Sequence, residues 1–437
     1  MAIHRVLALV SLWLGIVSAA APLPPSKDPW YSAPAGYEKT APGTVLRLRP
    51  AQGNLTDMIG NSSATYNILY RTTDSRYKPT WAVTTLLVPE LGPASVAATV
   101  FDQAALLSYQ VPYDSADIDA SPSYTMYTTD ESGPYSAALG LGLFVSIPDY
   151  EGPLASFTAG VVSGHATLDS VRAVLSVGLG LNLTAPRVAL WGYSGGALAS
   201  EWASELAVQY APELTGTIKG AVLGGLTPNV TSVLNNISGK DSAGLAPSAI
   251  LGITSQYPEV QKWLISQLKT EGPYNKTGFL AARHLTVAEA GATYAGVDIP
   301  KYFKKGAATF RDPKITAIIN RDGVMGYHGV PQWPMFVYKA IHDEISDIAD
   351  TDALVERFCQ VGVNILYQRN TVGNHAEEGY YGLAPTVQWL AAIFTGIYPF
   401  AFKAEGCTIE NVTRNDTASP LTKRDVPEGV NGVFALW

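Results

Sequence analysis

Hydrophobic positions along the chain follow two periods. The segments 66–70 and 81–88 are apolar or alternating, with turn residues between them, and predict an early β-hairpin. Residues at helical spacing predict helices near 165–181 and over 197–210. Short apolar runs that predict buried strands lie at 96–101, 142–147, 187–191 and 218–223. Strands that alternate with helices in this order predict a mostly parallel sheet with crossover helices.

This alternation is interrupted in the middle of the chain. In residues 226–330, clusters of Gly, Asn and Pro separate short helical pieces such as 260–268, which predicts a mainly helical cap. Strands are expected again at 335–339 and 364–367, followed by an amphipathic helix over 383–397. The predicted organisation is a signal peptide, a first core part, the cap and a second core part with a C-terminal tail, at 1–21, 22–225, 226–330 and 331–437.

The N-terminus has the pattern of a secretory signal peptide. His4 and Arg5 precede an apolar run over 6–17, and small residues follow at 18–21. The run is shorter than the roughly 20 residues of a membrane-spanning helix, so a membrane anchor is the weaker alternative. We expect a secreted, extracellular protein without a transmembrane segment. Lys423-Arg424 in the polar tail is a weak signal for dibasic processing.

Cysteine and asparagine patterns agree with export. The chain has two cysteines, Cys359 and Cys407, which we expect to form a disulfide, with two free thiols as the alternative. Two cysteines cannot complete a tetrahedral zinc site, and neither a metal nor a cofactor is expected. The Asn-x-Ser/Thr acceptor pattern predicts N-glycosylation at Asn54, Asn61, Asn182, Asn229, Asn236, Asn275, Asn411 and Asn415.

Composition excludes several classes of protein. Hydrophobic residues make up 47% and charged residues 15%, which is too apolar for a disordered chain. The net charge is −8, and no basic stripe or Lys/Arg block is present. A nucleic-acid partner is therefore not expected.

The strongest chemical motif is Gly192-Tyr-Ser194-Gly-Gly196, which matches G-x-S-x-G. It follows a predicted strand and opens a predicted helix, the context of the nucleophile elbow in the α/β-hydrolase fold. Side chains at Gly192 and Gly196 would collide with neighbouring backbone in so sharp a turn. Ser194 is therefore the predicted nucleophile, and the N–H of Gly195 the predicted first oxyanion donor.

The base follows from the chain order Ser, acid, His in this fold. Of the six histidines, His375 remains because it alone follows a late predicted strand and leaves room for an acid ahead of it. Asp343 and Glu344 follow the strand at 335–339 most closely, and Asp343 is the predicted acid. Later candidates, which fit capping of the next helix, are Asp347, Asp350 and Asp352. For the second oxyanion donor, any residue over 102–124 qualifies.

The chain resembles the fungal secretory lipase family of α/β hydrolases over nearly its whole length after the signal peptide. The segments that carry the resemblance are Asp28-Pro-Trp-Tyr31, Tyr70-Arg-Thr-Thr73, Ser108-Tyr-Gln110 through Asp114, Pro122-Ser-Tyr124, Gly192–Gly196, Asp343-Glu344 and the two cysteines. The resemblance implies a Ser194–Asp343–His375 triad and assigns Asp114 as the second oxyanion residue. It also implies a Cys359–Cys407 disulfide and a cap with a lid and acyl tunnel.

The expected activity is carboxylic ester hydrolysis through an acyl-enzyme. The main prediction is a triacylglycerol lipase, which would contact a lipid interface. The alternative is an esterase that deacetylates a fungal secondary metabolite such as a trichothecene, because relatives include such enzymes. A small-molecule or lipid ester is the expected substrate in either case. Two further alternatives, a non-catalytic binding protein and a peptidase, have no specific support in the sequence.

Overall fold

The structure, a computed structural model, describes residues 21–91, 103–128 and 133–415. Three sequence predictions fall mostly or wholly outside these ranges: the signal peptide at 1–21, the strand at 96–101 and the Lys423-Arg424 signal. No helix in the described ranges is both long and apolar enough to cross a membrane.

A ten-stranded sheet runs through the molecule in the order β1-β2-β3-β5-β4-β6-β7-β8-β9-β10. The strands are β1 (Val45–Pro50), β2 (Ser62–Thr73), β3 (Pro79–Pro89), β4 (Ala105–Gln110), β5 (Phe144–Pro148), β6 (Arg187–Tyr193), β7 (Ile218–Gly224), β8 (Met335–Ala340), β9 (Ile365–Asn370) and β10 (Cys407–Val412). The first three pairings are antiparallel and the other six are parallel. This is the predicted α/β-hydrolase fold.

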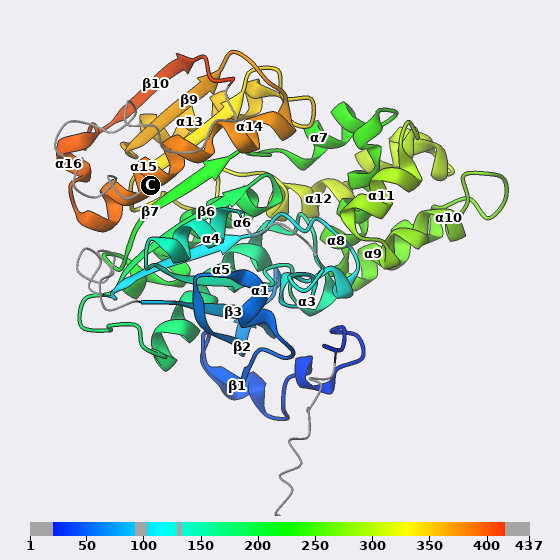
Figure 1. Ribbon diagram of the computed structural model, residues 1–437. Coiled ribbons are helices and arrows are strands. Elements are labelled where there is room, and N and C mark those ends of the chain that lie inside the picture. Colours follow the sequence, from blue (N-terminus) through cyan, green and yellow to red (C-terminus); the bar gives the residue numbers. More distant parts are fainter. Residues whose placement is uncertain (1–20, 92–102, 129–132, 416–437) are drawn as a thin grey trace, which may run out of the picture.

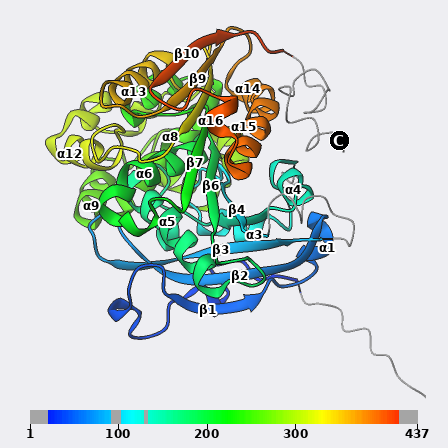
Figure 2. The ribbon, with the colours of Figure 1, turned by 90° about the vertical axis from the view of Figure 1, so that its left-hand side faces the viewer.

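Helices cover both faces of the sheet (Figures 1 and 2). One face packs against α5 (Gly160–Val177), α6 (Gly195–Tyr210) and α13 (Ile348–Gln360) in one apolar cluster. The opposite face packs against α4 (Gly133–Gly140) and α15 (Leu383–Thr395) in a second. Shorter helices are α1 (Leu55–Ile59), α3 (Pro122–Thr125), α14 (His375–Tyr381) and α16 (Tyr398–Ala401). Because both faces are covered, the central strands are mostly apolar, as their sequences predict.

The segment predicted as the cap forms a helical lobe to one side of the sheet (Figure 1). Its helices are α7 (Val230–Ile237), α8 (Leu245–Ser255), α9 (Pro258–Ser266), α10 (Lys276–Leu280), α11 (Val287–Tyr294) and α12 (Pro313–Asp322). They enclose an apolar cluster of their own. A polar contact joins this lobe to the core, because Asp322 Oδ1 accepts from the Val161 N–H at the start of α5, at 2.7 Å. The boundaries 226–330 remain a prediction.

Three strands were not predicted from the sequence: the two edge strands β1 and β10 and the buried strand β4. β4 is fully buried but contains Ser108 and Gln110, which interrupt its apolar run. The Gln110 amide exchanges hydrogen bonds with the hydroxyls of Ser108 and Ser200, so this polarity is satisfied inside the core. β10 is an edge strand with a mostly exposed surface, and it therefore lacks a hydrophobic pattern.

The cysteines form the predicted disulfide. Cys359, near the end of α13, is bonded to Cys407, the first residue of β10, across a sequence separation of 48. The bond ties the edge strand to the helix that packs beside it. It therefore braces the sheet edge next to β9, the strand that leads into the loop of His375.

The predicted glycosylation sites fall into two groups. Those with exposed side chains are Asn54, Asn61, Asn182, Asn411 and Asn415. The other three are half-buried and hydrogen-bonded: Asn229 and Asn275 cap α7 and α10, and Asn236 donates to the Glu344 carbonyl at 2.8 Å. Glycosylation at these positions remains a prediction, and the exposed group is sterically better suited to it.

Candidate active site

Ser194 lies in a tight turn between β6 and α6. Its φ of 53° and ψ of −119° are rare for a residue with a side chain. The neighbouring glycines make the turn feasible: a Cβ on Gly192 would lie 2.1 Å from the Gly196 carbonyl carbon, and one on Gly196 would lie 1.9 Å from the Gln110 oxygen. The steric reason proposed for both glycines is thus confirmed.

His375 is positioned to accept a proton from Ser194. Its Nε2 lies 2.9 Å from Ser194 Oγ, and its Nδ1 lies 2.7 Å from Asp343 Oδ2. The three side chains come from the turn after β6, the loop after β8 and the first residue of α14. Parallel strands bring these loops together at one edge of the sheet, although His375 is 181 residues from Ser194. The arrangement has the geometry of a nucleophile, base and acid.

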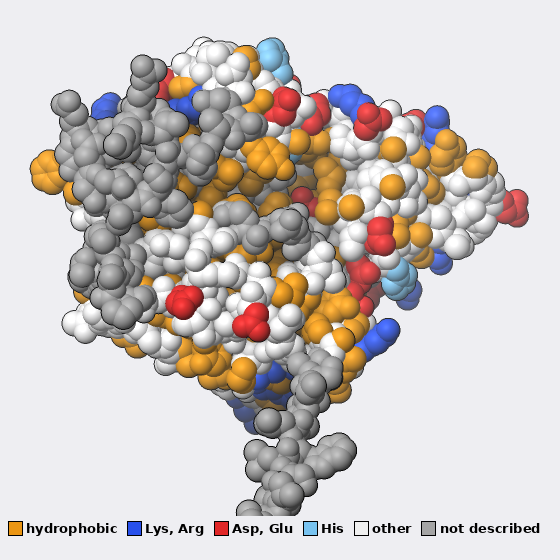
Figure 3. All heavy atoms as spheres, in the orientation of Figure 1, with side chains coloured by type: hydrophobic (Ala, Val, Ile, Leu, Met, Phe, Trp, Pro, Cys, Tyr) orange, Lys and Arg blue, Asp and Glu red, His pale blue; other side chains and the backbone are white. Residues whose placement is uncertain are grey.

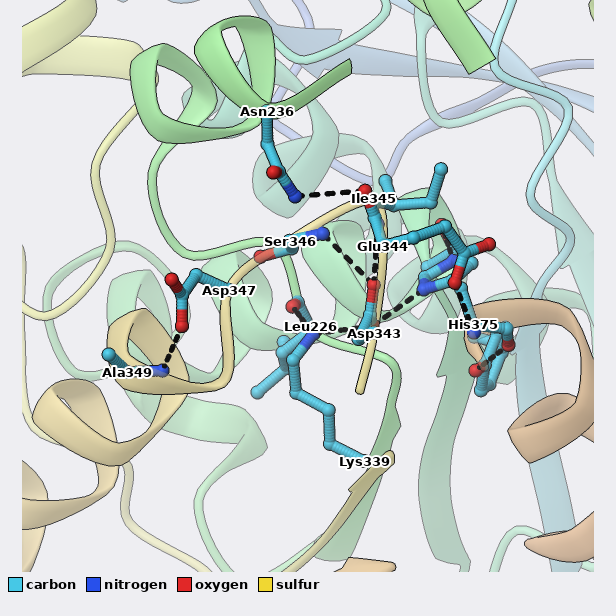
Figure 4. A network of polar contacts seen from close by, with 12 residues as sticks. Leu226, Asn236, Lys339, Asp343, Glu344, Ile345, Ser346, Asp347, Ala349 and His375 are labelled. Carbon is cyan, nitrogen blue, oxygen red and sulfur yellow. Dashed lines mark hydrogen bonds and ion pairs between the residues drawn. The ribbon is translucent and has the colours of Figure 1, made fainter. Parts of the chain in front are cut away.

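Asp343 is enclosed by donors (Figure 4). Oδ1 accepts from the backbone N–H groups of Ile345 and Ser346, both at 2.9 Å, and Oδ2 accepts from Lys339 Nζ at 2.6 Å as well as from His375. Burial raises the pKa of this carboxyl, but the hydrogen bonds and charges of His375 and Lys339 outweigh burial. They hold the pKa well below its usual range, so Asp343 stays ionised in mildly acidic solution.

Two side chains hold the backbone of His375. Its N–H donates to Glu344 Oε2 at 2.8 Å, and its carbonyl accepts from the Tyr193 hydroxyl. Asn374 and Glu377 complete a capping box at the start of α14. The imidazole is therefore held through its ring and through its main chain. From the sequence, Glu344 was only an alternative acid and Tyr193 had no predicted role, because neither backbone contact follows from sequence spacing.

Asp114 and Gly195 lie next to each other beside Ser194. Asp114 has a φ of 45°, and a Cβ on Gly195 would lie only 1.9 Å from Asp114 Oδ1. Both residues line the same cavity as Ser194. Burial raises the pKa of the neighbouring Glu151 carboxyl well above its usual range, and the Asp114 charge raises it further. The Glu151 carboxyl therefore favours its neutral form.

An apolar cavity, partly open to solvent, leads from Ser194 into the helical lobe. On the face shown in Figure 3, hydrophobic side chains gather around a hollow between the core and this lobe. The cavity walls come mainly from α7, α8 and α12 and include Leu234, Ile237, Ile250, Ile253, Ile315 and Ile319. Such a cavity suits a largely hydrocarbon ligand.

The other residues considered from the sequence as acid or base lie away from Ser194, His375 and Asp343. Asp347 accepts from Ala349 N–H at 2.9 Å and caps α13, as the alternative interpretation expected. Asp352 is bound to Tyr367 and Arg369, and His165 is buried against Tyr210. Within the described ranges, His, Cys, Asp and Glu form no cluster of three or more that could hold a metal ion.

Comparison with known proteins agrees with this geometry. A family model described as secretory lipase matches residues 119–400. The chain is 60% identical to a trichothecene C-3 esterase of Fusarium sporotrichioides over 100% of this chain and 99% of that protein. It is 39% identical to a probable trichothecene esterase of Stachybotrys chartarum over 91% and 82%.

Solved structures agree as well. The structure of Candida antarctica lipase A in its closed state superposes with a TM-score of 0.81 at 26% identity, covering 95% of this chain and 94% of that one. The fold, the family match and the sequence identity over nearly the full length all indicate the same family. The chain belongs to the secretory lipase family and is a carboxylic ester hydrolase.

Proposed function

We propose that this hydrolase works through Ser194, His375 and Asp343. Ser194 Oγ attacks the ester carbonyl carbon while its proton moves to His375 Nε2. Asp343 accepts from Nδ1 and stabilises the imidazolium that forms. His375 then protonates the leaving alcohol, and an acyl group remains on Ser194. A water molecule, deprotonated by His375, attacks this acyl-enzyme and releases the carboxylic acid. The observation that carries the proposal is the continuous Ser194–His375–Asp343 hydrogen-bond chain.

The oxyanion is proposed to accept hydrogen bonds from the Gly195 N–H and from the protonated carboxyl of Asp114, because a carboxylate has no proton to donate. Gly195 follows the nucleophile at the start of α6, where the helix dipole also favours negative charge. Asp114 is packed against Gly195 and lines the cavity beside Ser194. An oxyanion donor acts on the transition state, and its loss therefore lowers kcat more than it changes KM.

Replacement of Asp114 by alanine is accordingly expected to lower kcat by about 10²–10³-fold. The measurement is steady-state hydrolysis of p-nitrophenyl acetate, with KM changed little. Asp119→Asn is the control, because Asp119 is bonded to Ser26 and lies outside the cavity lining. A raised KM with kcat preserved would instead assign Asp114 to substrate binding.

The proposed substrate is an acetylated trichothecene or a similar acetylated terpenoid alcohol. Two relatives with trichothecene esterase names, one of them 60% identical over the full length, support the alternative from the sequence over the triacylglycerol lipase. The apolar cavity beside Ser194 is chemically suited to a rigid, mainly hydrocarbon alcohol. The acetyl group would be the part transferred to Ser194.

A comparison of substrates tests this choice. We expect kcat/KM for a soluble 3-O-acetyl trichothecene to exceed that for an emulsified long-chain triacylglycerol by on the order of 100-fold. Liquid chromatography of the deacetylated alcohol and titration of released fatty acid measure the two rates, and Ser194→Ala supplies the blank. If kcat/KM were higher on the emulsified triacylglycerol, with a rate that rises steeply once droplets form, the protein would instead be a triacylglycerol lipase.

A further inference from the structure

Lys339 is an unusual component of the site. It is the penultimate residue of β8, its side chain is 0% exposed, and it lies within an otherwise apolar strand. Its ammonium group donates to Asp343 Oδ2 at 2.6 Å and to the Leu226 carbonyl at 2.9 Å (Figure 4). One buried cation therefore joins the proposed acid to the chain that leaves β7 for the helical lobe.

Burying an ammonium group costs several kcal/mol unless good partners compensate. Burial lowers the pKa of Lys339, and the Asp343 carboxylate opposes this shift. Other charged groups that act on Lys339 or on Asp343 come from the loop after β8, from α13 and from α14. They are Asp347, Asp350, His375 and Glu378. None of these four groups has a hydrogen bond to Lys339, whereas Asp343 accepts one from its ammonium group. An apolar residue would fill a strand position in the core at lower cost, so the position is better explained by the site than by the fold.

We propose that Lys339 is a positioning residue for ester hydrolysis. Its ammonium group holds Asp343 Oδ2 against His375 and ties the loop after β8, which carries Asp343, to the carbonyl of Leu226. This inference rests on the proposed triad. The two backbone donors hold Oδ1, but only Lys339 and His375 contact Oδ2. Without the ammonium group, Oδ2 has a single partner and Asp343 can rotate away from His375.

The charge of Lys339 has a second effect, on acid tolerance. His375 and Lys339 together hold the pKa of Asp343 below its usual range against the effect of burial. Removing Lys339 leaves burial opposed by His375 and the two backbone donors to Oδ1, without the buried cation, so the pKa of Asp343 rises. The carboxylate then becomes protonated at a higher pH and ceases to orient the imidazole. As pH is lowered, the variant therefore loses activity at a higher pH than the native protein does. A merely structural role for Lys339 would leave this pH unchanged.

The test is Lys339→Met, which keeps the length of the side chain and removes its charge. We expect kcat on p-nitrophenyl acetate to fall about 10–100-fold with KM nearly unchanged, by analogy with other residues that orient a reacting group. The acid limb of the kcat profile should move to higher pH. Rates are expressed per active site titrated with a phosphonate, so that misfolded protein is not counted. Lys219→Met, at an exposed lysine of β7, is the matched control.

Lys339→Gln, which is neutral and polar, serves as the second variant and should show the same shift of the acid limb. Unchanged kcat and an unchanged acid limb per titrated site would overturn the proposal. Failure of both variants to yield titratable protein would also overturn it, since Lys339 would then be required for the fold. The triad is tested separately: if Ser194→Ala retains activity, the triad itself fails, whatever Lys339→Met does.

Discussion

Replacement of Ser194 by alanine is expected to reduce ester hydrolysis by about 10⁶-fold, to the level left by the oxyanion site and binding. The change removes the atom that lies 2.9 Å from His375 Nε2, and no acyl-enzyme can then form. Hydrolysis of p-nitrophenyl acetate by the purified variant is the direct measurement. A fluorophosphonate should transfer its phosphonyl group to Ser194 of the native chain, with loss of fluoride, and leave the variant unmodified.

One outcome would contradict this assignment. Residual activity above a few per cent, with contamination excluded by mass spectrometry, would show that another residue attacks the ester. Ser200→Ala is a suitable control on the same helix, because Ser200 is buried and bonded to Gln110 rather than to the site. That variant should retain most of the activity per phosphonate-titrated site.

Replacement of Asp343 by asparagine is the second large effect, with kcat expected to fall about 10⁴-fold. All four partners of the carboxylate donate: Ile345 N–H and Ser346 N–H to Oδ1, and Lys339 and His375 to Oδ2. An amide has only one acceptor atom, so its NH₂ group must face donors in either orientation. If it faces His375, the imidazole adopts the wrong tautomer and Nε2 can no longer accept the serine proton.

The matched control is Asp347→Asn, which lies on the same loop. Asp347 caps α13, where asparagine is about as good as aspartate, so activity and stability should change little. Both variants are assayed by kcat on p-nitrophenyl acetate and by thermal unfolding. A loss of less than about tenfold in folded Asp343→Asn would show that His375 does not depend on Asp343 for its tautomer.

The proposed nucleophile and base could be selected from the sequence because their constraints are local or topological. The glycines around Ser194 are required by contacts within the turn itself and with the neighbouring strand. His375 followed from chain order, since a parallel sheet brings the loops after successive strands to one edge. The disulfide followed from there being only two cysteines.

Residues that act through partners distant in the chain were not predictable. Lys339 contacts the carbonyl of Leu226 across a sequence separation of 113, and Tyr193 contacts the carbonyl of His375 across 182. In the sequence, Lys339 is merely a charge inside an apolar run. The polar Gln110 likewise prevented the prediction of the central strand β4, because its hydrogen-bond partner Ser200 lies 90 residues away in the sequence. A single sequence contains no signal for such pairs.

Sequence alone was sufficient to predict the α/β-hydrolase fold and the esterase class, and to select the nucleophile, base and acid proposed here, because backbone sterics and strand order leave few alternatives. It was not sufficient for the shape of the cavity beside Ser194. That cavity is made by α7, α8 and α12, whose relative placement depends on packing within the helical lobe. Short helices separated by Gly and Pro can pack in many ways, and only long-range side-chain contacts select one of them.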